Sequence, residues 1–229
     1  MTLTEYDGHH VGHGLGREGP IVISDTHTFD KDVFLLPSHY SKDVSKVLIP
    51  RGLIRDRIEK LAYDILHCYA PGEPLHLICV LKGSRGFFTE LTSVLNRIYR
   101  YTEGHTEPPF IEYYVRLKKD QLHKGHIHTV SDDLTPLHGK HVLIVEDLVD
   151  SGVTLSRFCR QVLDLKPKSL RTATLLEKRK LNGAPAFKAD FAGFSVPDVF
   201  VVGYCIDLRE RYRDLDHISV LTDEAYHSH

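Results

Sequence analysis

Apolar residues along the chain form two kinds of pattern, short continuous runs and longer stretches with helical spacing. Residues 75–81 and 141–145 are almost wholly apolar, which is typical of strands buried on both faces of a sheet. Residues 53–69 and 87–99 instead carry apolar side chains at intervals of three and four positions. This spacing predicts two helices with one buried face each.

Further elements continue the alternation of strand and helix. Strands are predicted at residues 110–117, 169–176 and 199–204 and a helix at residues 154–165, whereas the polar residues 118–131 predict a long loop. Strands that alternate with helices favour an α/β fold in which helices flank a parallel sheet. Ligands of such sheets bind at the carboxyl ends of the strands, so we expect the functional site there.

Composition and charge narrow the possible classes of function. Hydrophobic residues make up 41% of the 229 and charged residues 26%, which suits a globular domain with a sizeable core. The formal net charge is −2, so no general affinity for nucleic acid or for a membrane surface is expected. No apolar run reaches the ~20 residues of a membrane-spanning helix, and the N-terminus has no apolar signal segment. We therefore expect a cytoplasmic protein.

The N-terminal residues 1–19 are rich in Gly and His and lack periodicity, which predicts a disordered arm before a single domain at residues 20–229. The histidines of the arm and of the polar loop have no acidic or Cys partner at a fixed spacing, so solvated histidines are favoured over a zinc site. Four cysteines lack CxxC spacing and indicate free thiols in a reducing compartment. They are Cys68, Cys79, Cys159 and Cys205.

The stretch VLIVEDLVDSGVTL, residues 142–155, joins a buried strand to polar chemistry. The apolar run ends at two adjacent carboxylates, Glu146 and Asp147, and a short polar turn with Gly152 leads into the predicted helix. Glycine lets a ligand approach the backbone closely, and the N–H groups and dipole of a helix N-terminus attract anions. The turn therefore predicts a site for a phosphate monoester, although it lacks the GxxxxGK[ST] of a Walker A loop.

The two carboxylates need a different role, because they repel phosphate. Vicinal hydroxyls of a ribose, or a Mg²⁺ held by those hydroxyls, would suit Glu146 and Asp147. The alternative is a surface turn in which both acids are solvated and Asp150 caps the helix. On the first interpretation, the residues around the phosphate and ribose are Glu146, Asp147, Asp150, Ser151, Gly152, Val153 and Thr154.

Several motifs together resemble a known family. EDLVDSGVT at residues 146–154 resembles the signature with which type I phosphoribosyltransferases bind phosphoribosyl pyrophosphate (PRPP), and the chain from about residue 21 to 223 resembles their purine-salvage branch. The other motifs, in the family's order, are LIPRGLIRDRIEKLA at 48–62, VLKGSRGFF at 80–88, LLEKRK at 175–180 and PDVFVVGYCIDLRERYRDL at 197–215. The resemblance implies the α/β fold already expected, with a small hood over the carboxyl ends of the strands. It also implies a homodimer or homotetramer.

The resemblance further implies a reaction in which hypoxanthine or guanine displaces pyrophosphate from PRPP and gives IMP or GMP. Asp150 would be the catalytic carboxylate that accepts or shares a purine proton. Mg²⁺ at Glu146 and Asp147, and a second Mg²⁺ at Asp207, would offset the charge of the leaving group. The residues expected around the pyrophosphate are Leu81, Lys82, Gly83 and Arg213, with a cis peptide before the lysine.

The purine pocket is implied in the same way. Lys178 would donate to the 6-oxo group and so disfavour adenine, Phe200 would stack on the ring, and Val201 and Asp207 would meet the purine edge. The alternatives are an ordinary solvated lysine at 178, core packing of Phe200 in a strand, and a solvated charge cluster around Arg213.

One segment departs from the family. The family usually carries a Ser-Tyr pair in the mobile loop that follows Arg116-Leu117-Lys118, whereas residues 119–131 contain no Tyr and no Ser before Ser131. Three outcomes stay open: turnover with a different lid, slow turnover or a shifted purine preference such as xanthine or adenine, or a regulatory protein that only binds PRPP or nucleotide. The complete set of expected site residues favours an enzyme.

Overall fold

A computed structural model of the chain describes residues 19–69, 73–101, 110–119, 127–180 and 187–227. The expected arm lies outside these ranges except for Gly19, and so does the centre of the expected loop, residues 120–126. Within the described ranges, no helix is both long and apolar enough to cross a membrane.

Seven strands form the main sheet, in the order β1-β8-β7-β6-β3-β4-β5. Neighbouring strands are parallel throughout, except that β5 runs antiparallel to β4. This confirms the predicted α/β class with a parallel sheet. The strands are β1 (Ile21–Val22), β3 (Leu75–Leu81), β4 (Phe110–Lys119), β5 (Ile127–Ser131), β6 (His141–Val149), β7 (Ser169–Lys178) and β8 (Phe191–Val196).

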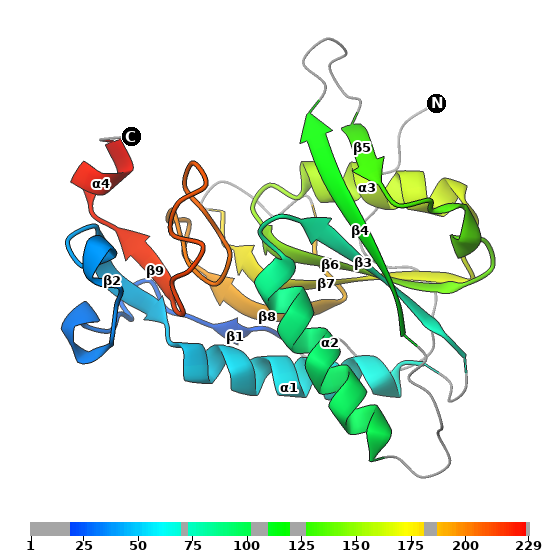
Figure 1. Ribbon diagram of the computed structural model, residues 1–229, viewed down its shortest axis with the longest axis horizontal. Helices are drawn as coiled ribbons and strands as arrows, with labels where there is room; N and C mark the ends of the chain where they lie inside the picture. The colour runs from blue at the N-terminus through cyan, green and yellow to red at the C-terminus, as the bar shows by residue number, and fades with distance from the viewer. Residues whose placement is uncertain (1–18, 70–72, 102–109, 120–126, 181–186, 228–229) are drawn as a thin grey trace.

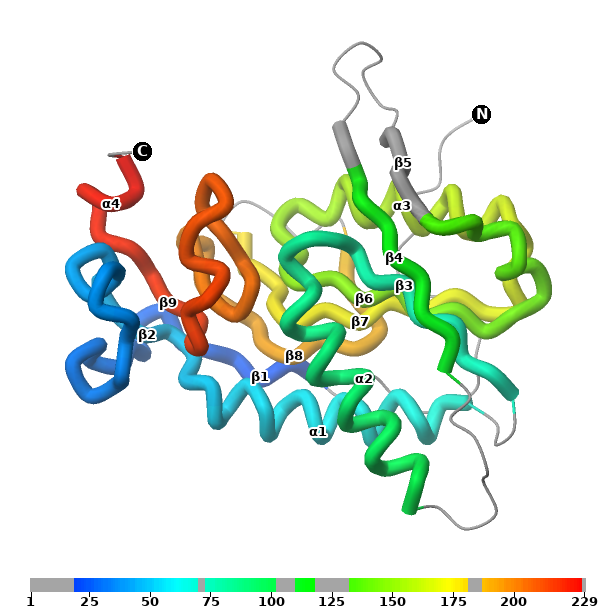
Figure 2. The backbone as a smooth tube through the Cα atoms, viewed as in Figure 1, coloured from blue at the N-terminus to red at the C-terminus, as the bar shows by residue number. Residues whose placement is uncertain are grey.

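Helices cover both faces of this sheet. In Figures 1 and 2, α1 (Arg51–His67) and α2 (Arg85–Arg100) lie on one side of the sheet and α3 (Val153–Asp164) lies on the other. All three helices lie close to the predicted positions. Each face has its own hydrophobic core, one packed against α1 and α2 and one packed against α3.

The burial of strand β6 on both faces explains why residues 142–145 are all apolar. Leu143 and Val145 belong to the core on the side of α1 and α2, whereas Val142 and Ile144 belong to the core on the side of α3. Successive side chains of a strand point to opposite faces, so a strand covered on both faces needs an apolar residue at every position. The two carboxylates that follow interrupt this run before Val149, which is buried again in the core on the side of α3.

A small second sheet forms the hood. It pairs β2 (Val44–Ile49) with β9 (Ile218–Leu221) in antiparallel fashion, and α4 (Asp223–His227) follows it. Figure 1 shows this unit at the end of the molecule toward which the arrows of β3 and β7 point. The hood has a separate core, formed by Tyr40, Val44, Val202, Tyr212, Leu215, Leu221 and Ala225.

Two predicted elements differ from the structure. Residues 199–204 do not form a strand: the strand that pairs with β7 is Phe191–Val196, and Pro197 follows it. The predicted run is apolar because Val201 and Val202 are buried. Both belong to an irregular excursion of the chain between β8 and β9, in which the described residues form isolated β-bridges and no strand. The expected loop 118–131 is shorter than predicted, because β4 extends to Lys119 and residues 127–131 pair with it as β5.

Candidate functional site

The predicted site residues gather at the carboxyl ends of β3, β6 and β7, which are neighbours in the sheet. Strand β6 continues to Val149, so Glu146 and Asp147 lie within a strand that pairs with β7. The residue that begins α3 as its N-cap is Gly152, not Asp150. Both observations contradict the alternative of a surface turn capped by Asp150.

The turn between β6 and α3 has the backbone shape expected of an anion site. Gly152 adopts a φ of 74°, in the left-handed region that favours glycine. A Cβ at this position would lie 2.3 Å from Cβ of Phe187, so the turn also has no room for a side chain. The first N–H groups of α3 have no partner within the helix and are available to an anion at the turn.

The two adjacent carboxylates lie against the turn that follows β3. A Cβ on Gly83 would lie 1.7 Å from Oδ2 of Asp147, so the absence of a side chain at 83 makes room for this carboxylate. The Asp147 N–H donates to Glu146 Oε1 over 3.0 Å, and the Leu148 N–H donates to Asp147 Oδ1 over 2.7 Å. The ends of β3 and β6 therefore form one continuous polar surface.

Burial perturbs the pKa of both carboxyls, and the charge of Asp147 perturbs that of Glu146 as well. Desolvation raises the pKa of Glu146 well above its usual range, and the neighbouring Asp147 charge raises that pKa further. Desolvation also raises the pKa of Asp147, although hydrogen bonds from Glu146 and from the Leu148 N–H oppose the rise. A divalent cation would relieve the repulsion, so the donor set suits Mg²⁺, which proteins bind through one or two carboxylates and ligand oxygens.

The same repulsion yields a stability prediction. The Glu146→Gln variant should be more stable than wild type, with a free energy of unfolding about 1 kcal/mol higher at about pH 7 without ligand. The reason is that a desolvated like-charge contact disappears. A raised carboxyl pKa in the folded state makes wild type lose stability as pH rises from the ordinary glutamate pKa to the folded value. The advantage should therefore shrink toward about pH 4 in urea unfolding experiments.

The matched control is Glu59→Gln, which removes a surface carboxylate paired with Arg97 on α2. It should change stability little at either pH, because exposed ion pairs contribute about 0–1 kcal/mol. An advantage of Glu146→Gln that stays constant with pH would contradict the assigned repulsion.

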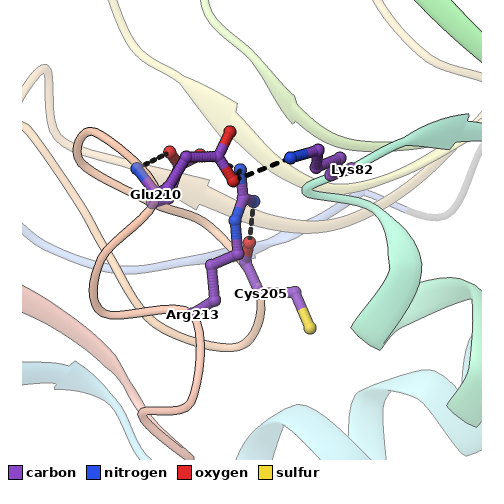
Figure 3. Close-up of polar contacts among 5 residues, drawn as sticks. Lys82, Cys205, Glu210 and Arg213 are labelled. Atoms are coloured by element: carbon purple, nitrogen blue, oxygen red, sulfur yellow. Dashed lines mark hydrogen bonds and ion pairs between the residues drawn. The ribbon is translucent and has the colours of Figure 1, made fainter.

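The turn after β3 carries the expected cis peptide, between Leu81 and Lys82. Figure 3 shows that the Lys82 ammonium points toward the excursion between β8 and β9, where it donates to Glu210 Oε2 over 2.9 Å. The Arg213 guanidinium approaches the same carboxylate at 3.3 Å and donates to the Cys205 carbonyl over 2.7 Å. The two cations predicted to hold pyrophosphate thus converge on one carboxylate.

Asp207 belongs to this network. Its Oδ1 pairs with Arg213 at 2.8 Å, and its Oδ2 accepts from the Glu210 N–H over 2.8 Å. Nε of Arg213 is buried and has no hydrogen-bond partner among the described residues. Arg213 is therefore part of an ordered ion network and not of a solvated charge cluster.

Apart from Asp207, the residues predicted to contact a purine lie at or shortly after the ends of β7 and β8. The Lys178 side chain is only 10% exposed, which contradicts an ordinary solvated lysine. Phe200 is 38% exposed, so it does not pack in the core. The centroid of its ring lies 5.0 Å from that of Tyr226 in the hood. Val201 is buried at 2% exposure, and its side chain packs in the core on the side of α1 and α2.

Lys180 also lies at this site, although the sequence motifs assigned no role to it. Its ammonium pairs with Oδ1 of Asp150 and lies 2.9 Å from Oδ1 of Asp198. The Lys180 ion pair holds the pKa of Asp150 below its usual range, and Lys178 contributes less to the same effect. Residues two apart in an extended chain face the same way, so the spacing of Lys178 and Lys180 was the available signal.

Among the described residues, no group of three or more His, Cys, Asp and Glu side chains could hold a metal ion by itself. Any cation at Glu146 and Asp147 would therefore need oxygens from a ligand, which is the usual situation of Mg²⁺ beside phosphates.

Comparisons with known proteins agree with this geometry. Residues 50–209 match the phosphoribosyl transferase domain. The chain is 47% identical to a hypoxanthine-guanine-xanthine phosphoribosyltransferase of Plasmodium falciparum over 93% of each chain. It is 39% identical to the human hypoxanthine-guanine phosphoribosyltransferase over 90% of this chain and 95% of the human one.

Comparison of the fold with solved structures supports the same family. A crystal structure of the Schistosoma mansoni hypoxanthine-guanine phosphoribosyltransferase in complex with IMP superposes with a TM-score of 0.77 and 32% identity. The match covers 91% of this chain and 98% of the other. The chain therefore belongs to the phosphoribosyltransferase family of enzymes, in its hypoxanthine-guanine branch.

Proposed function

We propose that the protein transfers the phosphoribosyl group of PRPP to hypoxanthine or guanine, producing IMP or GMP and pyrophosphate for purine salvage. The observation that carries this proposal is the contact between the Asp147 carboxylate and Gly83. It joins the phosphate turn after β6 to the turn before α2, so that a single ligand with a phosphate on one side of a ribose and a pyrophosphate on the other can reach both.

We assign each part of PRPP to one part of the surface. The 5′-phosphate binds the turn from Asp150 to Thr154, and the ribose hydroxyls face Glu146 and Asp147. The pyrophosphate binds Leu81, Lys82, Gly83 and Arg213. The orphaned Nε of Arg213 supports this assignment, because a buried donor without a partner is costly unless a ligand pairs with it.

Mg²⁺ fits the carboxylates, with Glu146 and Asp147 at one ion and Asp207 at a second. Bound there, the ions would neutralise charge on the leaving pyrophosphate. The protein's own residues hold the two reactants in line and place an anionic carboxylate beside the positive charge that develops on the sugar. Asp150 accepts or shares the imidazole proton of the purine as the new bond to ribose forms.

Lys178 determines the purine preference in this proposal. A buried ammonium donates to the 6-oxo group of hypoxanthine or guanine but meets the donating amine of adenine. A site built for one hydrogen-bond pattern rejects the mismatched base by up to about 10⁴-fold. Xanthine also has a 6-oxo group and is a second candidate substrate, because the Plasmodium falciparum relative carries xanthine in its name.

The test is a spectrophotometric assay of the purified protein with PRPP and Mg²⁺ and each of hypoxanthine, guanine, xanthine and adenine. Turnover of the 6-oxo purines without adenine would support the proposal. No turnover of any base, with GMP still raising the melting temperature, would instead support a regulatory nucleotide-binding protein. The presence of every expected site residue, including Asp150, favours the enzyme.

The proposal also covers the oligomeric state and the location in the cell. We propose a homodimer or homotetramer, as the resemblance to the family implies. We also propose a cytoplasmic location, which the four free cysteines support because unpaired thiols suit a reducing compartment.

Glu210 competes with pyrophosphate for Lys82 and Arg213, which yields a prediction. The Glu210→Gln variant should lower the KM for PRPP by about two- to five-fold, since pyrophosphate no longer has to displace this exposed ion pair. Its kcat with hypoxanthine should change less than its KM, because the lost pair exists only before PRPP binds.

The control for Glu210→Gln is Glu59→Gln, far from the site on α1, which should leave the KM for PRPP unchanged. An increase in the KM of the Glu210→Gln variant would show that Glu210 instead helps to hold Lys82 and Arg213 in the binding geometry. Steady-state kinetics with varied PRPP at saturating hypoxanthine distinguish the two results.

A further inference from the structure

Four charged side chains form an alternating chain across the purine end of the site. Asp150 comes from the turn after β6, Lys178 and Lys180 come from the end of β7, and Asp198 follows β8. Lys180 pairs with both acids, at Oδ1 of Asp150 and at 2.9 Å from Oδ1 of Asp198. Lys178 lies 4.0 Å from the same oxygen of Asp198.

The two lysines therefore share one acidic neighbour unequally. The distance from Lys180 to Asp198 is that of a hydrogen bond, whereas 4.0 Å is at the limit of an ion pair. Lys178 is the more buried of the two, with 10% of its side chain exposed against 31% for Lys180. A buried ammonium next to an unpartnered carboxylate would close that distance, because both groups have lost most of their water.

We propose that Lys180 is a positioning residue for purine recognition: by pairing with Asp198 it keeps the Lys178 ammonium available to the purine, and by pairing with Asp150 it holds the catalytic carboxylate. The inference rests on the proposed function for the identity of the purine. It assigns no contact between Lys180 and the reacting atoms. Without Lys180, Asp198 captures Lys178 and withdraws its ammonium from the 6-oxo group.

The charges around Asp150 are consistent with this arrangement. The groups that act on the Asp150 carboxyl are the ammoniums of Lys180 and Lys178, and both lower its pKa. Conversely, Asp150 and Asp198 both raise the pKa of Lys180. Asp150 and Lys180 are thus each stabilised in the charged form, and removal of Lys180 leaves two acids beside one remaining cation.

The experiment compares Lys180→Ala, Lys180→Arg and the double variant Lys180→Ala/Asp198→Asn with wild type. Lys180→Ala should raise the KM for hypoxanthine and guanine about 10-fold, the lower range for loss of a hydrogen bond from a charged donor. The KM for PRPP should stay within about two-fold, since the affected lysine is assigned to the purine alone. The double variant should recover most of the purine KM, because the neutral amide that replaces the Asp198 carboxylate would no longer attract Lys178 as a charge.

Controls separate this effect from simple loss of structure. Lys168→Ala removes a comparable exposed lysine, paired with Glu73, and should leave both KM values unchanged. Lys180→Arg keeps a cation between the acids and should retain a purine KM near that of wild type. An unchanged purine KM in Lys180→Ala, or no recovery in the double variant, would overturn the proposal.

Binding of GMP, measured by calorimetry, keeps the inference separate from the proposed activity. Lys180→Ala should weaken GMP binding, and the double variant should restore it, whether or not turnover occurs. If wild type turns over none of the bases, the proposed function fails, while the GMP series still decides the role of Lys180.

Discussion

Replacement of Asp150 with Asn is expected to lower kcat for hypoxanthine by about 10²–10⁴-fold, the usual range for a lost general base. The amide has nearly the shape of the carboxylate but does not accept the purine proton. It also lacks the negative charge that stabilises positive charge developing on the purine and sugar. The KM for PRPP should change much less, because the phosphate turn binds through backbone groups that the substitution leaves in place.

The Asp150→Asn experiment needs a control for the ion pair with Lys180, which the same substitution weakens. Lys180→Ala breaks that pair and keeps the carboxylate, so its kcat should fall far less than that of Asp150→Asn. Asp64→Asn, which removes a half-buried acid on α1 paired with Lys60, controls for charge alone. A kcat for Asp150→Asn within about three-fold of wild type would remove Asp150 from the catalytic role.

Much of the sheet and its site could be predicted because the relevant signals are local. The apolar runs of β3 and β6 reflect burial on both faces, which fixes their type and their place in the centre of the sheet. The acids Glu146 and Asp147 follow directly from the end of such a run. Both acids could therefore be placed at the carboxyl end of a central strand from the sequence alone.

The strand β8 could not be predicted in the same way. Its sequence, FAGFSV, contains Gly193, and small residues have weak strand propensity. The structure gives the reason for the glycine, because a Cβ there would lie 2.6 Å from the Leu175 carbonyl oxygen in β7. Residues 199–204 look more like a strand, but their burial serves the packing of the excursion into the cores and not a ladder of backbone hydrogen bonds.

The partners of the site residues also lie beyond the reach of sequence patterns. Lys82 and Glu210 are 128 positions apart, and Glu210 has a φ of 67° in a segment with several left-handed residues. No periodicity places such a carboxylate, since its position depends on the whole course of the excursion between β8 and β9. The pairing of Lys180 with Asp150 likewise requires the register of β6 and β7, which only the folded sheet defines.

The second large effect is expected for Gly152→Ala. We expect the free energy of unfolding to fall by about 2–5 kcal/mol, from overpacking of about 1–3 kcal/mol and a left-handed backbone worth about 1–2 kcal/mol. The added methyl would meet the Phe187 side chain at 2.3 Å, and Phe187 is 1% exposed within the core beneath α3. The turn must then shift, so the KM for PRPP should rise at least about 10-fold.

Two other glycines separate the two causes of the Gly152→Ala effect. Gly139 has nearly the same φ, 68°, with no atom within 4 Å of an added Cβ, so Gly139→Ala should cost only the backbone part, about 1–2 kcal/mol. Gly52 lies in α1 with equal space and an ordinary helical backbone, so Gly52→Ala should stabilise by about 0.4–1 kcal/mol. Urea unfolding of the three variants gives the order, and PRPP kinetics add the functional test. If Gly152→Ala resembled Gly139→Ala in stability and left the KM for PRPP unchanged, close packing against Phe187 would not be what shapes the phosphate turn.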